Sequence, residues 1–121
     1  MPDFTLPHID AETALRLTAT GGALLIDLRK PPAVAASGQL IDGALRRDPF
    51  AFSHDDPLMA DSRHLIAFCV HGHEVSQFAC ALLMLHGRDA RYVTGGFEAL
   101  KAAGAPLAPL EKPDEYSGGR P

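Results

Sequence analysis

The sequence predicts a single α/β domain in which helices flank a central, mainly parallel sheet. Short apolar runs of strand length alternate along the chain with stretches whose apolar residues recur at helical spacing, and this alternation is typical of parallel sheets. Residues 23–27 and 65–68 are the clearest strands, and their continuous apolar character predicts buried, parallel neighbours. The 121 residues suffice for one hydrophobic core but not for two.

The predicted elements follow one another with short connections. They are a helix over 11–18, a strand over 23–27, a short helix over 32–37, strand pieces at 40–41 and 44–45, a strand over 65–68, a helix over 75–85, a strand over 91–93 and a helix over 97–103. Asp10 is a suitable N-cap for the first helix, which the sequence Thr-Gly-Gly at 20–22 ends. Two prolines at 31–32 stop the first strand and favour a helix start, and Gly38 ends that helix.

The rest of the chain contains one irregular segment and one predicted tail. Residues 48–63 hold two prolines among several aspartates, which indicates a surface loop with at most a short helix. Gly87 ends the long helix, and Thr-Gly-Gly at 94–96 forms the turn before the last one. The domain is predicted to span residues 1–108, and residues 109–121, rich in proline, glycine and charge, are predicted to be a flexible tail.

Composition excludes several classes of function. The net charge is −4 and no basic cluster is longer than Arg46-Arg47, so a nucleic-acid partner is not expected. No run of about 18 apolar residues predicts a membrane span, and the first residues lack the pattern of a signal peptide. Two cysteines do not make a disulfide framework, and we therefore expect a cytoplasmic protein with reduced thiols.

Cys69 is the most informative residue because it stands where a buried strand passes into a helix. It follows the strand at 65–68, and a short polar loop with one glycine leads to the helix at 75–85. Unsatisfied backbone N–H groups and the helix dipole at such a junction stabilise a thiolate, which predicts a pKa below the ordinary value of about 8.5. Cys80 lies within the almost wholly apolar helix and is predicted to be a core residue without a disulfide to Cys69.

Four segments resemble motifs of one family, and they occur in the family's order. The segments are L-I-D-L-R at 25–29, G-Q-L-I-D-G-A at 38–44, F-C-V-H-G-H-E-V-S at 68–76 and Y-V-T-G-G-F at 92–97. Together they are similar to the single-domain rhodaneses, over roughly residues 9–105. The resemblance implies a three-layer rhodanese-like fold and a sulfurtransferase that carries sulfane sulfur as a persulfide on Cys69.

The resemblance also implies roles for the residues around Cys69. In the family, the loop that begins at the cysteine curls so that its backbone N–H groups cradle the outer sulfur. The implied substrate-binding residues here are Val70, His71, Gly72, His73, Glu74 and Val75. The residues implied to support the site from behind are Asp27, Arg29 and Ser76. For Asp27 and Arg29 the alternative is a structural role, as a strand-end cap and a surface ion pair. Neither a metal nor a cofactor is implied.

The chain departs from the family at positions that bear on the donor. Glu74 stands where the family often has arginine, so its carboxylate is expected to repel thiosulfate and to favour a persulfide or protein donor. Protonation of His71 or His73 would offset that charge. Gln39 and Asp42 replace the usual histidine and proline of the second motif, which predicts a differently shaped loop.

Three alternatives remain open beside sulfur transfer to a thiol or cyanide. Cysteine phosphatases and arsenate reductases need C-x5-R, and Val75 occupies the position of that arginine. A metal site at Cys69-x-His71-x-His73 would need a fourth ligand. A non-enzymatic or redox-sensing module is the third alternative, with the retained Cys69 favouring an enzyme. The expected partners are a small sulfur donor and a thiol acceptor, possibly a protein, and the expected state is a monomer or homodimer.

Overall fold

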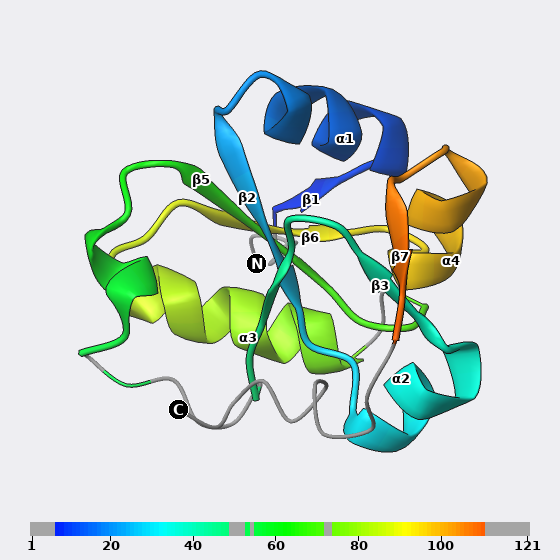
Figure 1. The fold of residues 1–121 in the computed structure, drawn as a ribbon. Coiled ribbons are helices and arrows are strands. Elements are labelled where there is room, and N and C mark those ends of the chain that lie inside the picture. The colour runs from blue at the N-terminus through cyan, green and yellow to red at the C-terminus, as the bar shows by residue number, and fades with distance from the viewer. Residues whose placement is uncertain (1–6, 49–52, 54, 72–73, 111–121) are drawn as a thin grey trace, which may run out of the picture.

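A five-stranded parallel sheet forms the centre of the computed structural model (Figure 1), which describes residues 7–48, 53, 55–71 and 74–110. The strands are β1 (His8–Ile9), β6 (Ala90–Val93), β5 (His64–Phe68), β2 (Ala23–Asp27) and β4 (Leu45–Arg46), in that spatial order. All four strand pairs in this sheet are parallel. The α/β class and the mainly parallel sheet are thus confirmed.

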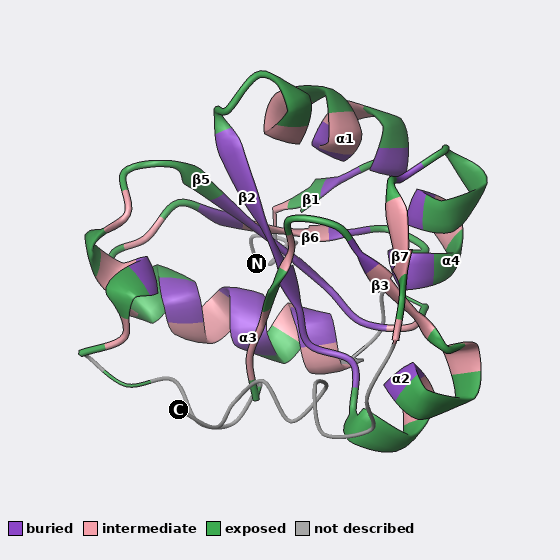
Figure 2. Cartoon of the chain, in the orientation of Figure 1, coloured by how far each residue is buried: buried purple, intermediate pink, exposed green. Residues whose placement is uncertain are grey.

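Helices cover both faces of the sheet and give the molecule three layers. Helices α1 (Ala11–Ala19) and α4 (Gly96–Ala102) pack together on one face, and α3 (Glu74–Leu85) covers the other. Side chains along β2 and β5 alternate between the two hydrophobic clusters beneath these helices, as the two-residue period of a strand requires. Both strands are almost continuously buried (Figure 2), which confirms the inference from their apolar sequences.

The central pair β2–β5 brings together the segments that follow both strands. Its register places Asp27 opposite Phe68, and the Leu28 amide donates to the Phe68 carbonyl at 2.8 Å. The residues after β2 and the residues after β5 therefore emerge side by side at the carboxyl end of the sheet. Open α/β sheets place their ligand sites at this end.

Short elements complete the connections close to the positions predicted. Helix α2 (Pro31–Ser37) ends at Gly38, whose φ of 66° is the left-handed conformation that glycine adopts without strain. The loop over 48–63 contains the 3₁₀-helix η1 (Pro57–Ala60). Within the described residues, no helix is both long enough and apolar enough to span a membrane.

Two strands were missed from the sequence, and one of them crosses the predicted domain boundary. β1 has only two residues, too few for a pattern. β7 (Leu107–Pro109) pairs antiparallel with β3 (Gln39–Ile41) in a small second sheet, and the Leu110 amide donates to the Gly38 carbonyl at 2.9 Å. Regular structure thus continues past residue 108, whereas residues 111–121 lie outside the described residues. Pro109 is compatible with an edge strand because its missing N–H need not join a ladder.

Candidate active site

Cys69 lies immediately after β5, and its thiol is held against the first turn of α3. The residue is buried, with 8% of its surface exposed. Its Sγ donates a hydrogen bond to the hydroxyl oxygen of Ser76 at 3.4 Å, and Ser76 is completely buried. Because a serine hydroxyl both accepts and donates, the same contact can stabilise the thiol and the thiolate. The first N–H groups of α3 have no partner within that helix, which favours negative charge at this end.

The backbone around Cys69 is positioned by the start of α4. The Phe97 amide donates to the Cys69 carbonyl at 2.7 Å, and the Glu98 amide donates to the Val70 carbonyl at 3.3 Å. The turn that makes this possible needs glycine at Gly95, where φ is 80° and an added Cβ would lie 2.6 Å from the Ala99 Cβ. The last Thr-Gly-Gly turn therefore holds the cysteine loop in place.

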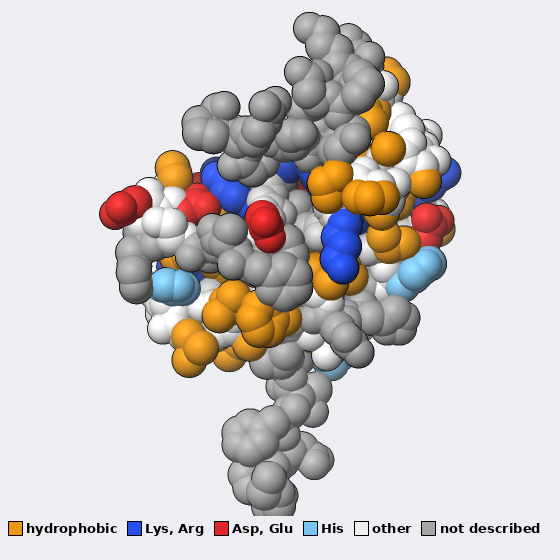
Figure 3. Space-filling view, turned by 90° about the horizontal axis from the view of Figure 1, so that it is seen from below, with side chains coloured by type: hydrophobic (Ala, Val, Ile, Leu, Met, Phe, Trp, Pro, Cys, Tyr) orange, Lys and Arg blue, Asp and Glu red, His pale blue; other side chains and the backbone are white. Residues whose placement is uncertain are grey.

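A cavity of about 450 Å³ opens beside Cys69 at the carboxyl end of the sheet. Its lining comes from the segment after β2 and the segment after β5, and consists of Leu28, Arg29, Lys30, Ala33, Cys69, Val70, His71 and Val75. Figure 3 views the molecule from this end and shows basic and acidic side chains beside apolar ones near the middle of the face. The Cys69 thiol thus borders a largely apolar hollow of the size that small organic ligands occupy, about 300–1,000 Å³.

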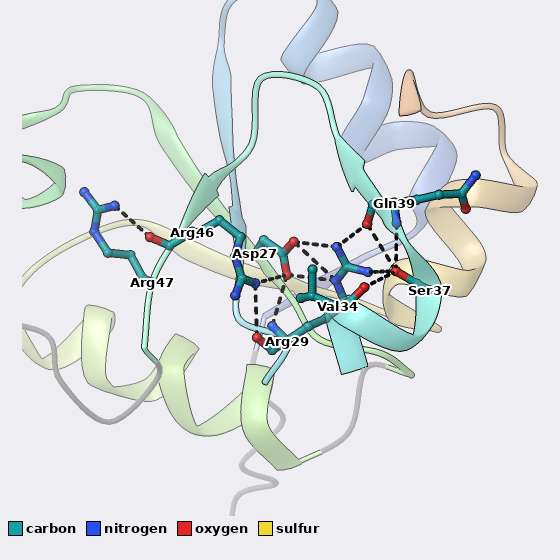
Figure 4. A network of polar contacts seen from close by, with 7 residues as sticks. All are labelled: Asp27, Arg29, Val34, Ser37, Gln39, Arg46 and Arg47. Atoms are coloured by element: carbon teal, nitrogen blue, oxygen red, sulfur yellow. Dashed lines mark hydrogen bonds and ion pairs between the residues drawn. The ribbon is translucent and has the colours of Figure 1, made fainter. Parts of the chain in front are cut away.

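A buried ion cluster supports the cavity from behind (Figure 4). The Arg29 guanidinium binds the Asp27 carboxylate with Nη2–Oδ2 and Nε–Oδ1 distances of 2.8 and 3.0 Å, and both side chains are 1% exposed. Arg46 Nη1 lies 3.3 Å from Asp27 Oδ1, and burial lowers the pKa of Arg46, an effect that Asp27 partly offsets. Two guanidinium groups therefore share one carboxylate behind the site.

Arg29 also connects four elements, so its role extends beyond the ion pair. It donates to the Ser37 hydroxyl at 3.1 Å and to the Gln39 carbonyl at 2.9 Å. Its guanidinium carbon lies 3.9 Å from the centre of the Phe97 ring, a cation–π contact. The pair is therefore buried and structural, rather than the surface ion pair that the sequence left open.

Cys80 differs from Cys69 in lying inside a helix, away from the cavity. It is completely buried within α3, and its Sγ lies 3.9 Å from the Pro7 carbonyl oxygen. Burial raises the pKa of the Cys80 thiol to about 11. A neutral, enclosed thiol is a poor nucleophile, and neither cysteine forms a disulfide. These observations leave Cys69 as the candidate nucleophile.

The family model of the rhodanese-like domain matches residues 10–103. The chain belongs to the rhodanese-like domain family. No curated protein matches the chain.

Solved structures share the fold of this rhodanese-like domain at low sequence identity. A rhodanese-related protein from Thermoplasma volcanium has a TM-score of 0.70 and 19% identity, covering 87% of this chain and 99% of its own. A rhodanese-like domain from Anabaena has a TM-score of 0.69 and 21% identity, covering 89% and 83%. A Rhodopseudomonas palustris protein of unknown function, described as a possible tyrosine phosphatase, has a TM-score of 0.71 and 18% identity, covering 89% and 99%. These likenesses show the fold alone.

The structure of this rhodanese-like domain gathers only part of the predicted substrate loop around the cavity. Val70, His71 and Val75 line it together with Cys69. Gly72 and His73 lie outside the described residues, as does the Glu74 side chain, so the sulfur cradle and the effect of that carboxylate remain predictions. Within the part of the chain that the structure describes, no three side chains from His, Cys, Asp and Glu come together as a metal site.

Three lining residues were missed from the sequence, and all follow β2. Leu28, Lys30 and Ala33 reach the cavity because β2 pairs with β5 in parallel. The sequence contained a signal for these residues, because the chain segments that follow neighbouring parallel strands meet at one edge of the sheet. From this segment the sequence predicted roles only for the motif residues Asp27 and Arg29.

Proposed function

We propose that this rhodanese-like domain is a sulfurtransferase that carries sulfane sulfur as a persulfide on Cys69. The observation that carries the proposal is the placement of the Cys69 thiol, against Ser76 in the first turn of α3 and open to a cavity. The helix terminus, the serine hydroxyl and the nearby Arg29 guanidinium all favour negative charge on the Cys69 sulfur. The family supports sulfur chemistry, and the buried Cys80 leaves one candidate nucleophile.

The first half-reaction loads the enzyme. The Cys69 thiolate attacks the outer, sulfane sulfur of the donor, a new S–S bond forms, and the bond between the sulfane sulfur and the donor breaks. A persulfide donor leaves as its thiolate, and thiosulfate leaves as sulfite with the bonding electron pair. No external oxidant is required, because the sulfane sulfur is transferred at its existing oxidation level.

The second half-reaction returns the enzyme to its starting state. A thiolate or cyanide acceptor attacks the outer sulfur of the Cys69 persulfide, and the Cys69 thiolate leaves. The products are an acceptor persulfide or thiocyanate. Cys69 alternates between two covalent states, so the kinetics are ping-pong. We place the reaction in the cytoplasm, where a chain with two cysteines keeps its thiols reduced.

Mass spectrometry of the intact protein tests this proposal. Incubation with a sulfane donor should add one sulfur atom to Cys69, and cyanide should remove it with formation of thiocyanate. Cys69→Ser should stay folded and lose both loading and transfer, because a hydroxyl is not ionised at neutral pH. The matched Cys80→Ser variant should load normally. Equal loss of loading in both folded variants would contradict the assignment.

Phosphate-ester hydrolysis is the rival that a structural neighbour raises, and the cavity argues against it. A phosphatase loop clamps its substrate with a bidentate arginine six positions after the cysteine. Val75 occupies that position and contributes an apolar wall to the cavity. Hydrolysis of p-nitrophenyl phosphate that depends on Cys69 would favour the phosphatase instead.

A further inference from the structure

Lys30 is the residue at the Cys69 cavity whose role neither the motifs nor the ion cluster explains. It is exposed, follows the β2 strand end and lines the same cavity as Cys69. The neighbouring basic groups are already engaged, because Arg29 and Arg46 both bind the Asp27 carboxylate. Among the described residues, no ion pair involves Lys30. Its charge is therefore available to a ligand in the cavity.

The walls beside Lys30 suit carbon rather than an inorganic anion. Four lining residues are aliphatic: Leu28, Ala33, Val70 and Val75. A cavity of about 450 Å³ exceeds what the sulfate-sized thiosulfate dianion fills, and desolvating such a dianion against aliphatic walls is costly. A donor with a short hydrocarbon chain would instead bury apolar surface there.

A second hollow extends the available room and restricts where negative charge can lie. It measures about 310 Å³, shares Arg29, Ala33 and Val70 with the first, and reaches Phe97 and Glu98. Glu98 is exposed and places a carboxylate at the far end. An anionic group is disfavoured there and favoured beside Lys30, which orients a donor that carries one.

We propose that Lys30 is a specificity-determining residue that binds the carboxylate of an organic persulfide donor. The inference rests on the proposed sulfurtransferase function and names its donor class, the persulfides of small thiols that carry a carboxylate. The carbon chain of the donor lies on the aliphatic walls, its carboxylate contacts the Lys30 ammonium, and its sulfane sulfur reaches Cys69 Sγ. Thiosulfate offers the charge without the chain and is the poorer donor.

Two donors of equal length test the charge contact. The persulfides of 3-mercaptopropionate and of 3-mercaptopropionamide have the same three-carbon chain and differ by a neutral amide in place of the carboxylate. At low salt, wild type should prefer the carboxylate donor by about fivefold in kcat/KM, the size expected for one exposed charge contact. Lys30→Gln should lose that preference while kcat/KM for the neutral donor stays within about twofold, and Lys30→Arg should retain the preference. Added salt should weaken it.

The control and the outcomes separate this inference from the function on which it rests. Lys101→Gln removes an exposed lysine of α4 that lines neither hollow and should behave as wild type. The role of Lys30 is overturned if Lys30→Gln keeps the preference for the carboxylate donor, or if its kcat/KM falls equally for both donors. Thiosulfate loading wild type more efficiently than the carboxylate persulfide overturns the donor class. If wild type takes sulfur from none of these donors, the proposed function itself is overturned.

Discussion

Replacing Ser76 by alanine should raise the pKa of Cys69 by about one unit. Ser76 is the hydroxyl that the structure places against the thiol, 3.4 Å from Sγ, at a completely buried position. Ionisation of Cys69 turns this contact into a hydrogen bond to a charged sulfur. Alanine removes this hydroxyl. Because the thiolate then loses more stabilisation than the neutral thiol does, the pKa of Cys69 rises.

The magnitude follows from the difference between the two protonation states. A hydrogen bond to a charged group contributes about 1.5–3 kcal/mol, and a neutral one about 0.5–1.5 kcal/mol. The difference is about 1–1.5 kcal/mol, and each pKa unit corresponds to about 1.36 kcal/mol. Ser76→Ala should therefore shift the Cys69 pKa upward by about one unit, so that the thiolate fraction at a pH below both values falls about tenfold.

The rate of alkylation by iodoacetamide as a function of pH measures this pKa directly. Only the thiolate reacts, and digestion followed by mass spectrometry assigns the modified cysteine. Cys80 interferes little below pH 10 because its pKa is about 11 and its side chain is buried. Sulfur loading by a persulfide at pH 7 should slow in parallel.

Ser62→Ala is the matched control, since Ser62 is an exposed serine in the loop before β5. It should leave the alkylation profile unchanged. Urea unfolding of both variants should show that each is folded at the pH values used. A Cys69 pKa that moves by less than about 0.3 units in folded Ser76→Ala, or that falls, would refute the reasoning that this hydroxyl stabilises the thiolate.

Three further predictions concern stability. Asp27→Asn should cost about 3–5 kcal/mol in urea unfolding, because it leaves the buried Arg29 and the half-buried Arg46 without the carboxylate that they share, whereas Arg46→Met should cost only about 1–2 kcal/mol. Equal costs would contradict the shared-carboxylate arrangement. Gly95→Ala should lower the Tm more than Gly21→Ala, because both glycines have φ near 80° but only a Cβ at position 95 would collide with another side chain. Equal shifts in Tm would mean that backbone strain alone destabilises both variants. Cys80→Ala should lessen the loss of stability as pH rises from 9 to 11, by roughly 2 kcal/mol. The raised Cys80 pKa keeps that thiol neutral in the fold while it ionises in the unfolded chain, and an unchanged pH profile would contradict this.

Local sequence patterns predicted the elements and singled out the candidate nucleophile. Continuous apolar runs predicted β2 and β5, and glycines such as Gly38 ended helices where a left-handed residue was needed, because both signals act within a few residues. The position of Cys69 between a buried strand and a helix followed from the same local reasoning. The two-residue β1 and the strand β7 carried no such signal, since each exists only through its pairing with a distant strand.

Tertiary structure decided what surrounds Cys69. Lys30 is 39 positions before it in the chain and reaches the same cavity only through the parallel register of β2 on β5. Phe97 follows it by 28 positions and donates to its carbonyl only because α4 begins beside β5. Whether Asp27 and Arg29 lay on the surface or in the interior was equally open, because the answer depended on Arg46, Ser37 and Phe97 packing around them. Side-chain chemistry and short-range conformation are written into neighbouring residues, whereas the free energy that selects a strand register is summed over contacts between segments far apart in the chain.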